Sequence, residues 1–231
     1  MKEGDIYREW DAPPEWRHAV ACCWEQRVVV ADRHQRVVPD GHADLLLHDS
    51  GVIEIVGLAD HVAVPLLPRG TRIRGIRLRP EAVAAALATN GSELVNLTVD
   101  AEDVLGARRV RELVDDRALD AWLRSIQPDG RTTNAVRLLA THPVTDTADE
   151  LGISVRHLRR VLTATIGLTP KSFQRVLRLQ RFLASAERSR TGLAAAAADA
   201  GYADQPHLTR EVVALTGTTP ARLLEERRQP T

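Results

Sequence analysis

The sequence predicts a β-rich α+β domain with helices at its end, followed by an all-α domain. In the first third of the chain, short runs are rich in Val, Ile and Leu, whereas everything after residue 130 has helical spacing. The charge also changes: residues 1–130 carry 16 basic and 22 acidic side chains, and residues 131–231 carry 15 and 9. Residues 157–170 recur at 207–220 with seven identical positions, which indicates a structural unit used twice.

The composition is that of an ordinary globular protein. The 231 residues are 44% hydrophobic and 27% charged, with no net formal charge at pH 7. No apolar run has membrane-spanning length, and the N-terminal MKEGDIYREW has no apolar signal-peptide segment. We therefore expect a cytoplasmic protein with no membrane partner. Cys22 and Cys23 are adjacent, so no disulfide framework is expected.

The first domain, predicted over residues 1–128, contains strands and then helices. Its strands are short and are separated by Pro, Gly or Asp, and its first helix begins at Pro80. Arginines that alternate with apolar residues in the last strand predict a solvated basic face, with a β-bulge at Gly75. We expect strands at 24–30, 36–38, 43–48, 52–56, 61–67 and 71–78, and helices at 80–88, 102–114 and 116–126.

The second domain, predicted over residues 131–228, follows the turn-forming stretch 127–130 (QPDG). Ser154 and Asp204 are suited to cap helices, and two Thr-Pro pairs match the start of further helices. The helices are expected near 132–142, 145–151, 154–166, 171–188, 192–200, 205–216 and 220–228.

The first copy of the repeat reads as a helix-turn-helix. A short helix ends at Gly152, which can adopt the left-handed conformation, and a second helix starts at Ser154. Leu158 and Leu162 lie on one face of the second helix and three arginines on the other, where they repel one another unless a polyanion neutralises them. A solvated charged face is the alternative, but the Gly turn and the duplication favour DNA reading. The DNA-binding residues predicted here are Ser154, Arg156, His157, Arg159, Arg160 and Thr163.

The second copy repeats this geometry with fewer cations. Gln205 can read adenine, and Arg210 can read guanine or hold a phosphate. Pro206 has no donor at the position of Arg156, so the first helix is expected to dominate base readout. The DNA-binding residues predicted in this copy are Gln205, His207, Thr209 and Arg210.

Residues 132–228 resemble the DNA-binding domain of the AraC/XylS family of transcription regulators. The resemblance is carried by ELGISVRHLRR, by FQRVLRLQRFLAS and by GYADQPHLTREVVALTGTTP. It implies two helix-turn-helix motifs joined by one long linking helix, with both reading helices in successive major grooves of double-stranded DNA.

Residues 14–115 are similar to an N-terminal domain of some members of the same family. The segments that carry this similarity are ACCW, VVPDGHADLLLH and GIRLRPEAVAAAL. The similarity implies a compact, β-rich, partly cupin-like module for sensing or interaction.

Two groups of residues in the first domain are candidates for binding a ligand. Three tryptophans near the N-terminus suit the lining of an apolar effector pocket, although core anchoring is the alternative. The side chains of His42, Asp44, His48, Cys22, Cys23 and His61 are of metal-ligating types, but no spacing among them matches a known metal motif, so ordinary strand residues and no metal or cofactor are expected. The candidate ligand-binding residues are Trp10, Trp16, Trp24 and Cys23.

The sequence thus predicts a sequence-specific DNA-binding regulator with no catalytic site. Its first domain is expected to bind a small organic effector or to form a homodimer. The alternative is a metal-dependent, cupin-like enzyme with an attached nucleic-acid module, which metal analysis of the purified protein would detect.

Overall fold

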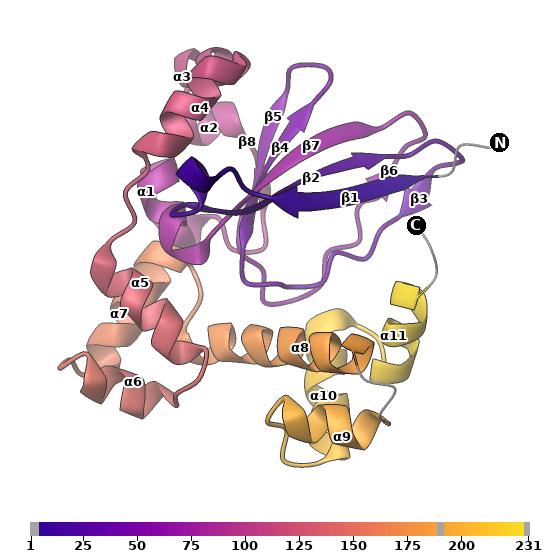
Figure 1. Ribbon diagram of the computed structural model, residues 1–231, viewed down its shortest axis with the longest axis vertical. Coiled ribbons are helices and arrows are strands. Elements are labelled where there is room, and N and C mark those ends of the chain that lie inside the picture. Colours follow the sequence, from indigo (N-terminus) through magenta and orange to yellow (C-terminus); the bar gives the residue numbers. More distant parts are fainter. Residues whose placement is uncertain (1–4, 189–191, 229–231) are drawn as a thin grey trace.

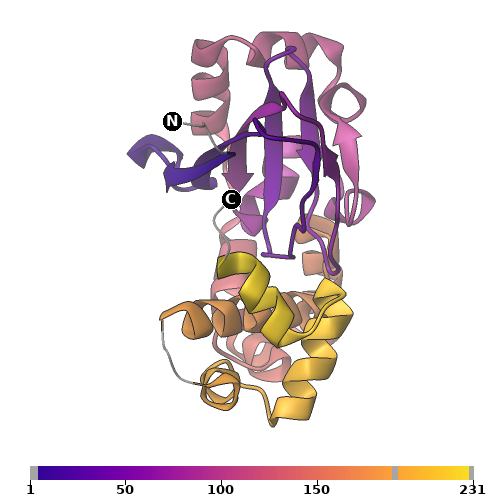
Figure 2. The ribbon, with the colours of Figure 1, turned by 90° about the vertical axis from the view of Figure 1, so that its right-hand side faces the viewer.

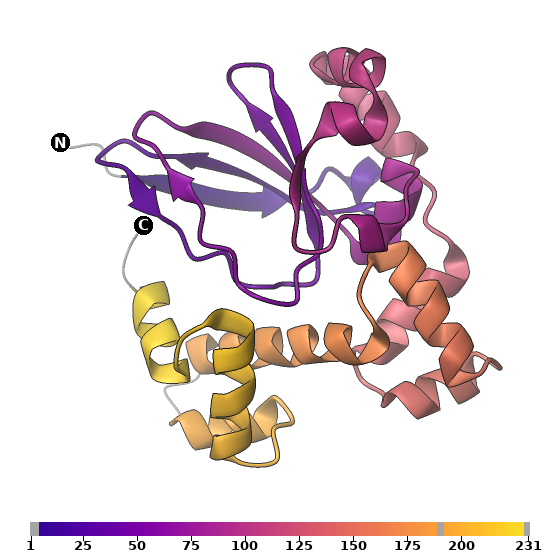
Figure 3. The same ribbon diagram turned by 180° about the vertical axis from the view of Figure 1, so that it is seen from behind.

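The computed structural model describes residues 5–188 and 192–228, so residues 1–4 of the predicted first domain lie outside the described residues. A β-sheet with flanking helices lies above a layer of helices (Figures 1 and 2). Helix α8 (Pro170–Arg188) runs beneath the sheet and joins two groups of short helices, as Figure 3 shows from behind. The predicted class, a β-rich domain with helices followed by an all-α region, is confirmed.

The main sheet has six antiparallel strands in the order β1-β2-β7-β4-β5-β8. Strand β7 lies in its middle, between β2 and β4, and a separate two-stranded sheet pairs β3 with β6. The strands are β1 (Ile6–Asp11), β2 (Val20–Arg27), β3 (Arg33–His34), β4 (Ala43–His48), β5 (Ile53–Val56), β6 (Leu66–Leu67), β7 (Arg72–Leu78) and β8 (Thr98–Asp100).

The sheet differs from the prediction at its edges. Strands β1 and β8 were not predicted, because edge strands bury little and so lack a clear apolar alternation. The strand expected at 36–38 forms only one bridge, between Val37 and Ala63, and the strand expected at 61–67 is reduced to that bridge and the short β6, whose partner β3 lies just before the predicted range. The strands at 43–48, 52–56 and 71–78 are confirmed within a residue, and the one expected at 24–30 begins earlier, at Val20.

The two faces of the sheet differ in chemistry. Leu45, Ile55 and Leu78 point to one face, where they are almost fully buried under the helices of the first half. Trp24 and Arg77 point to the other face, which also carries several polar side chains. The predicted basic face is therefore wrong, because Arg77 lies on the opposite side of β7 from the exposed Arg72 and Arg74.

Gly75 is not a bulge. It pairs in register with Trp24 on β2 and with Leu46 on β4, and the irregularity of β2 lies between Val20 and Cys22. A Cβ atom on Gly75 would lie 1.9 Å from Cε2 of Trp24, so the glycine makes room for the indole ring.

Helices at one end of the sheet complete the first half. The predicted helix at 80–88 is a 3₁₀ turn, η2 (Pro80–Ala82), followed by α1 (Val83–Leu87). The single helix expected at 102–114 is two helices, since Gly106 has a positive φ of 79°. The remaining elements of this half are η1 (Pro14–Trp16), η3 (Gly91–Glu93), α2 (Ala101–Leu105), α3 (Ala107–Leu113) and α4 (Asp116–Ser125).

The seven helices predicted in the second domain are all present, with bounds that agree within three residues. Two core clusters hold them. One runs without interruption from the sheet through α5–α7 to Val176 of α8, and the other joins the rest of α8 to α9–α11. The shared core crosses the division predicted near residue 130, which stays a prediction. The helices are α5 (Gly130–Leu139), α6 (Val144–Glu150), α7 (Val155–Ile166), α9 (Leu193–Asp199), α10 (Gln205–Thr216) and α11 (Pro220–Arg228).

Replacing Gly75 by alanine is expected to destabilise the protein by about 1–3 kcal/mol, because the new methyl group would overlap the Trp24 ring. Urea unfolding followed by circular dichroism measures the change. Gly130→Ala is the matched control, since no atom lies within 4 Å of its Cβ position and its φ is not positive. Equal stability of the two variants would contradict the packing argument.

Candidate DNA-binding surface

Helix α7 is built to present cations. Ser154 caps it, its Oγ accepting the amide N–H of His157 at 3.2 Å, and Gly167 ends it with a φ of 88°. Leu158 and Leu162 are fully buried and fix which face turns inward. The opposite face is therefore presented to solvent.

The arginine stripe, which we define as Arg156, Arg159 and Arg160, is exposed on that face. Within the described part of the chain no carboxylate forms an ion pair with any of the three. Among the described residues, the one side-chain contact of the stripe joins Arg160 Nη2 to Nδ1 of His157 at 3.4 Å. Three unneutralised guanidiniums on one helical face have the charge and geometry that suit a polyanion.

All six DNA-binding residues predicted in the first copy meet in one concave surface of about 760 Å³, which we call the reading groove. Two residues from the sheet half also line it, Asn90 and Ser92 of the η3 turn. Sequence analysis did not identify these two, since they lie more than 60 positions from the helix. The lining residues are Asn90, Ser92, Ser154, Arg156, His157, Arg159, Arg160, Thr163 and Ala164.

Helix α10 has the same capped architecture, but it exposes fewer polar and charged side chains. Asp204 caps it by accepting the amide N–H of His207 at 2.6 Å, and Gly217 ends it with a φ of 67°. Two of its four predicted contact residues are already engaged. His207 Nδ1 accepts the amide N–H of Ala203 at 3.2 Å, and the Thr209 hydroxyl donates to a backbone carbonyl of the preceding turn.

Gln205 and Arg210 are the exposed polar side chains that α10 offers. Arg210 has no ion pair among the residues that the structure describes. The second helix-turn-helix thus presents one cation where the first presents three.

Ion pairs bind α10 to the linking helix. Glu211 accepts from Arg175 Nε at 2.9 Å and from Arg178 Nη1 at 3.1 Å, and its side chain is only 15% exposed. The guanidinium of Arg178 also lies 5.6 Å from the ring centre of Tyr202. Because Arg175 and Arg178 already bind Glu211 within the protein, they are poorly placed to hold phosphates.

The segment 36–41, between β3 and β4, contacts the second helical group and the linking helix α8. Arg36 donates to Glu226 at 2.9 Å and to the carbonyl of Thr216 at 2.7 Å, both in the second group. The amide of Gln180 on α8 donates to the carbonyl of Pro39 at 2.6 Å. Position 41 is glycine, and a Cβ there would lie 3.1 Å from the ring of Phe173.

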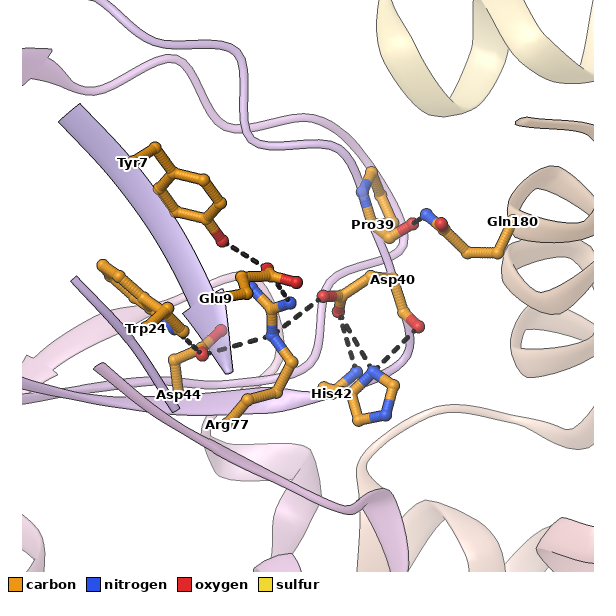
Figure 4. Close-up of polar contacts among 9 residues, drawn as sticks. All are labelled: Tyr7, Glu9, Trp24, Pro39, Asp40, His42, Asp44, Arg77 and Gln180. Atoms are coloured by element: carbon orange, nitrogen blue, oxygen red, sulfur yellow. Dashed lines mark hydrogen bonds and ion pairs between the residues drawn. The ribbon is translucent and has the colours of Figure 1, made fainter. Parts of the chain in front are cut away.

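A polar cluster at the base of this segment is centred on Arg77 (Figure 4). Its guanidinium lies 2.9 Å from Glu9, and its Nε lies 3.3 Å from both Asp40 and Asp44. The indole N–H of Trp24 donates to Asp44 at 2.8 Å. Since Asp40 follows Pro39, the cluster connects one face of the sheet to the contact with α8.

Burial and charge oppose each other in this cluster. Burial raises the pKa of Asp44 above its usual value, and the charge of Arg77 only partly offsets this. At Asp40 burial also raises the pKa, but the hydrogen bond from His42 and the charges of His42 and Arg77 outweigh it and the pKa is lowered. Arg77, flanked by these carboxylates, has a raised pKa and stays charged.

The side chains of metal-ligating types do not gather at one site. Asp44 bonds Trp24 and Arg77, His48 lies 2.7 Å from Glu54, and His61 lies 3.1 Å from Asp60. Cys22 and Cys23 are free thiols on opposite faces of β2, and burial raises the pKa of Cys22 to about 11. Over residues 5–188 and 192–228, no three His, Cys, Asp or Glu side chains gather in a way that could hold a metal.

The candidate ligand-binding residues do not share a pocket either. Trp10 and Cys23 lie opposite each other on one face of the sheet, whereas Trp24 is on the other face. Trp16 donates its indole N–H to Asp120 of α4 at 2.8 Å. Trp24 and Trp16 thus anchor packing, while Trp10 is 49% exposed at the edge strand.

None of the described helices has the length and apolarity needed to cross a bilayer.

Paired helix-turn-helix units on one linking helix, with an unneutralised arginine stripe on the first reading helix, define a DNA-binding protein. Residues 147–226 match the family described as a helix-turn-helix domain, and residues 8–100 match a domain of unknown function (DUF6597). The C-terminal region, over residues 147–226, is an AraC-type helix-turn-helix DNA-binding domain.

Solved structures are similar to the chain over two ranges. A transcriptional regulator with an AraC-type DNA-binding domain from Chromobacterium violaceum is 24% identical and covers 44% of this chain and 95% of its own, with a TM-score of 0.41. ToxT from Vibrio cholerae O395 is 10% identical over 98% of both chains, with a TM-score of 0.46. Wild-type ToxT with a bound unsaturated fatty acid is 9% identical over 97% of both chains, with a TM-score of 0.45. The comparison with curated proteins gave no match.

Replacing Arg156 or Arg160 by alanine is expected to weaken binding to the preferred DNA site by about 1–3 kcal/mol and to relax sequence preference at one or two base pairs. Binding titrations of the full chain on the selected site and on single-base variants measure both effects. Arg108→Ala is the control, since its side chain is 91% exposed on α3 of the other half. An affinity loss that is equal on every sequence would mean that the stripe contacts phosphates only.

Arg77→Met is expected to destabilise the chain by about 3 kcal/mol at pH 7, because it leaves the half-buried carboxylates of Asp40 and Asp44 without their cation. The loss should shrink as the pH falls towards 4, since protonation removes the uncompensated charges of Asp40 and Asp44. Urea unfolding at several pH values tests this, with Arg72→Met, an exposed arginine of the same strand, as the control. A loss that does not depend on pH would assign Arg77 a packing role alone.

Proposed function

We propose that the two reading helices insert into successive major grooves on one face of a DNA duplex, and that the sheet half controls how they are placed. Helix α7 supplies most of the base readout through Arg156, Arg159 and Arg160, with Ser154, His157 and Thr163 beside them. Helix α10 contributes Gln205 and Arg210, with His207 and Thr209 supporting their turn. The observation that carries the assignment is the arginine stripe with no carboxylate partner in the described chain.

The sheet half is the regulatory part of this proposal. Its input is a small organic effector or a second copy of the chain, and it catalyses no reaction. Segment 36–41 gives such an input a physical path, because Arg36 bonds the second helical group and Pro39 bonds α8. A ligand changes DNA affinity only through different affinities for two arrangements, so it must alter contacts of this kind.

Hydroxyl-radical footprinting of the full chain on a site selected from random DNA tests the docking mode. We expect two protected major-groove segments about 10 base pairs apart on one face of the duplex. Protection of a single segment for each chain would overturn the docking of both helices.

A second arm of this experiment tests the control exerted by the sheet half. Inserting one base pair between the two segments should weaken binding of the wild type, and Arg36→Ala should reduce that penalty by about 1 kcal/mol by freeing the second helical group. Arg222→Ala is the matched control, because Arg222 also bonds Glu226, at 3.2 Å, but does not touch the sheet half. If the penalty is the same in Arg36→Ala and Arg222→Ala, segment 36–41 does not set the spacing of the reading helices.

A further inference from the structure

The η3 turn of the sheet half lies against the end of the first reading helix. A Cβ atom on Gly91 would lie 2.6 Å from the amide nitrogen of Gly167, and one on Gly167 would lie 2.5 Å from the carbonyl oxygen of Gly91. Both distances are shorter than any Cβ contact allows, so only two glycines permit this approach. The turn is consequently held at the C-terminal end of α7 by backbone contact.

The turn is also anchored on its own side. Asn90 Oδ1 accepts from the backbone N–H of Ser92 at 3.1 Å and from its hydroxyl at 2.8 Å. Leu94 is buried beneath it, so close to Gly57 that a Cβ there would lie 1.9 Å from the Leu94 carbonyl oxygen. The positions of Asn90 and Ser92 relative to α7 are thus fixed by packing on both sides.

The exposed parts of this turn face a cationic surface. Asn90 and Ser92 line the reading groove together with the arginine stripe, and none of the described residues that line it carries a carboxylate. The acidic residue of the turn, Glu93, is not part of the lining, and the Thr89 hydroxyl donates to it at 2.9 Å. A duplex whose major groove receives α7 therefore brings one backbone strand towards neutral, hydrogen-bonding groups.

We propose that Asn90 and Ser92 form a DNA phosphate contact beside the first reading helix, so that the sheet half itself takes part in binding. Hydroxyl and amide side chains are frequent phosphate ligands, and they position a duplex without reading its sequence. The side-chain amide nitrogen of Asn90, Nδ2, makes no hydrogen bond to another residue in the described chain. It is therefore the donor available for a phosphate oxygen. The inference rests on the proposed role of α7 as a reading helix.

Charge changes at Ser92 test this contact in the full chain. Ser92→Glu should lower affinity about tenfold, to the same extent on preferred and unrelated DNA, because it places a negative charge against a phosphate. Ser92→Arg should raise affinity on both DNAs and steepen the dependence of log affinity on log salt by about one. Ser50→Glu and Ser50→Arg, in the exposed turn between β4 and β5, control for the change in net charge.

The outcomes separate the two proposals. Ser92 variants that behave like the Ser50 variants, or a Ser92→Glu variant that binds more tightly, would overturn the phosphate contact. Arg156→Ala is measured in the same assay, and its weaker binding would leave the role of α7 intact in that event. If Arg156→Ala and Arg160→Ala bind as the wild type does, the proposed function fails first. Thermal unfolding of each variant confirms that a change in affinity does not come from unfolding.

Discussion

The contact between the backbones of Gly91 and Gly167 fixes the position of the first reading helix. Neither residue has room for a side chain there, so the η3 turn and the end of α7 approach more closely than any other residue pair would permit. The apolar core continues across the same junction, from the strands of the sheet to Leu158, Leu162 and Ile166. Because interiors are densely packed, the sheet half and the first helix-turn-helix behave as one body.

The second helix-turn-helix depends on a different kind of contact. Its core is separate and includes only the second half of α8. The sheet half reaches it through the hydrogen bonds of Arg36, the packing of the Val38 side chain against its core, and the contact between Gln180 of α8 and Pro39. A hydrogen bond adds about 1 kcal/mol net, far less than a continuous core, so the orientation of α10 is the part that a regulatory input can change at low cost.

The Arg77 cluster shows how the sheet could pass such an input to that contact. It places carboxylates from β1, β4 and segment 36–41 around the guanidinium of Arg77, and the carboxylate from that segment, Asp40, is next to the carbonyl that α8 binds. A group that displaced one of these carboxylates would leave the others unbalanced, since charges in a poorly solvated site respond to each other strongly. The cluster thus connects one sheet face to the linking helix through neighbouring atoms.

The helix-turn-helix units could be predicted because their signals are local. A cap, a glycine turn and apolar residues at helical spacing lie within about 25 positions, and the charged face of α7 follows from which residues must turn inward. The edge strands β1 and β8 gave no such signal, because they bury few side chains and take their place from pairing.

The sequence by itself determined the helical class of the second half, its duplication and six of the seven residues that α7 and its cap contribute to the reading groove. Only the tertiary structure decided which residues of the sheet half lie next to the reading helices. Asn90, Ser92 and Arg36 lie far from the reading helices in the chain, and Gly75 and Arg77 acquire their roles from neighbours on adjacent strands. The order of strands and the packing of the core bring these residues together, and a pattern that repeats along one segment carries no record of such distant partners.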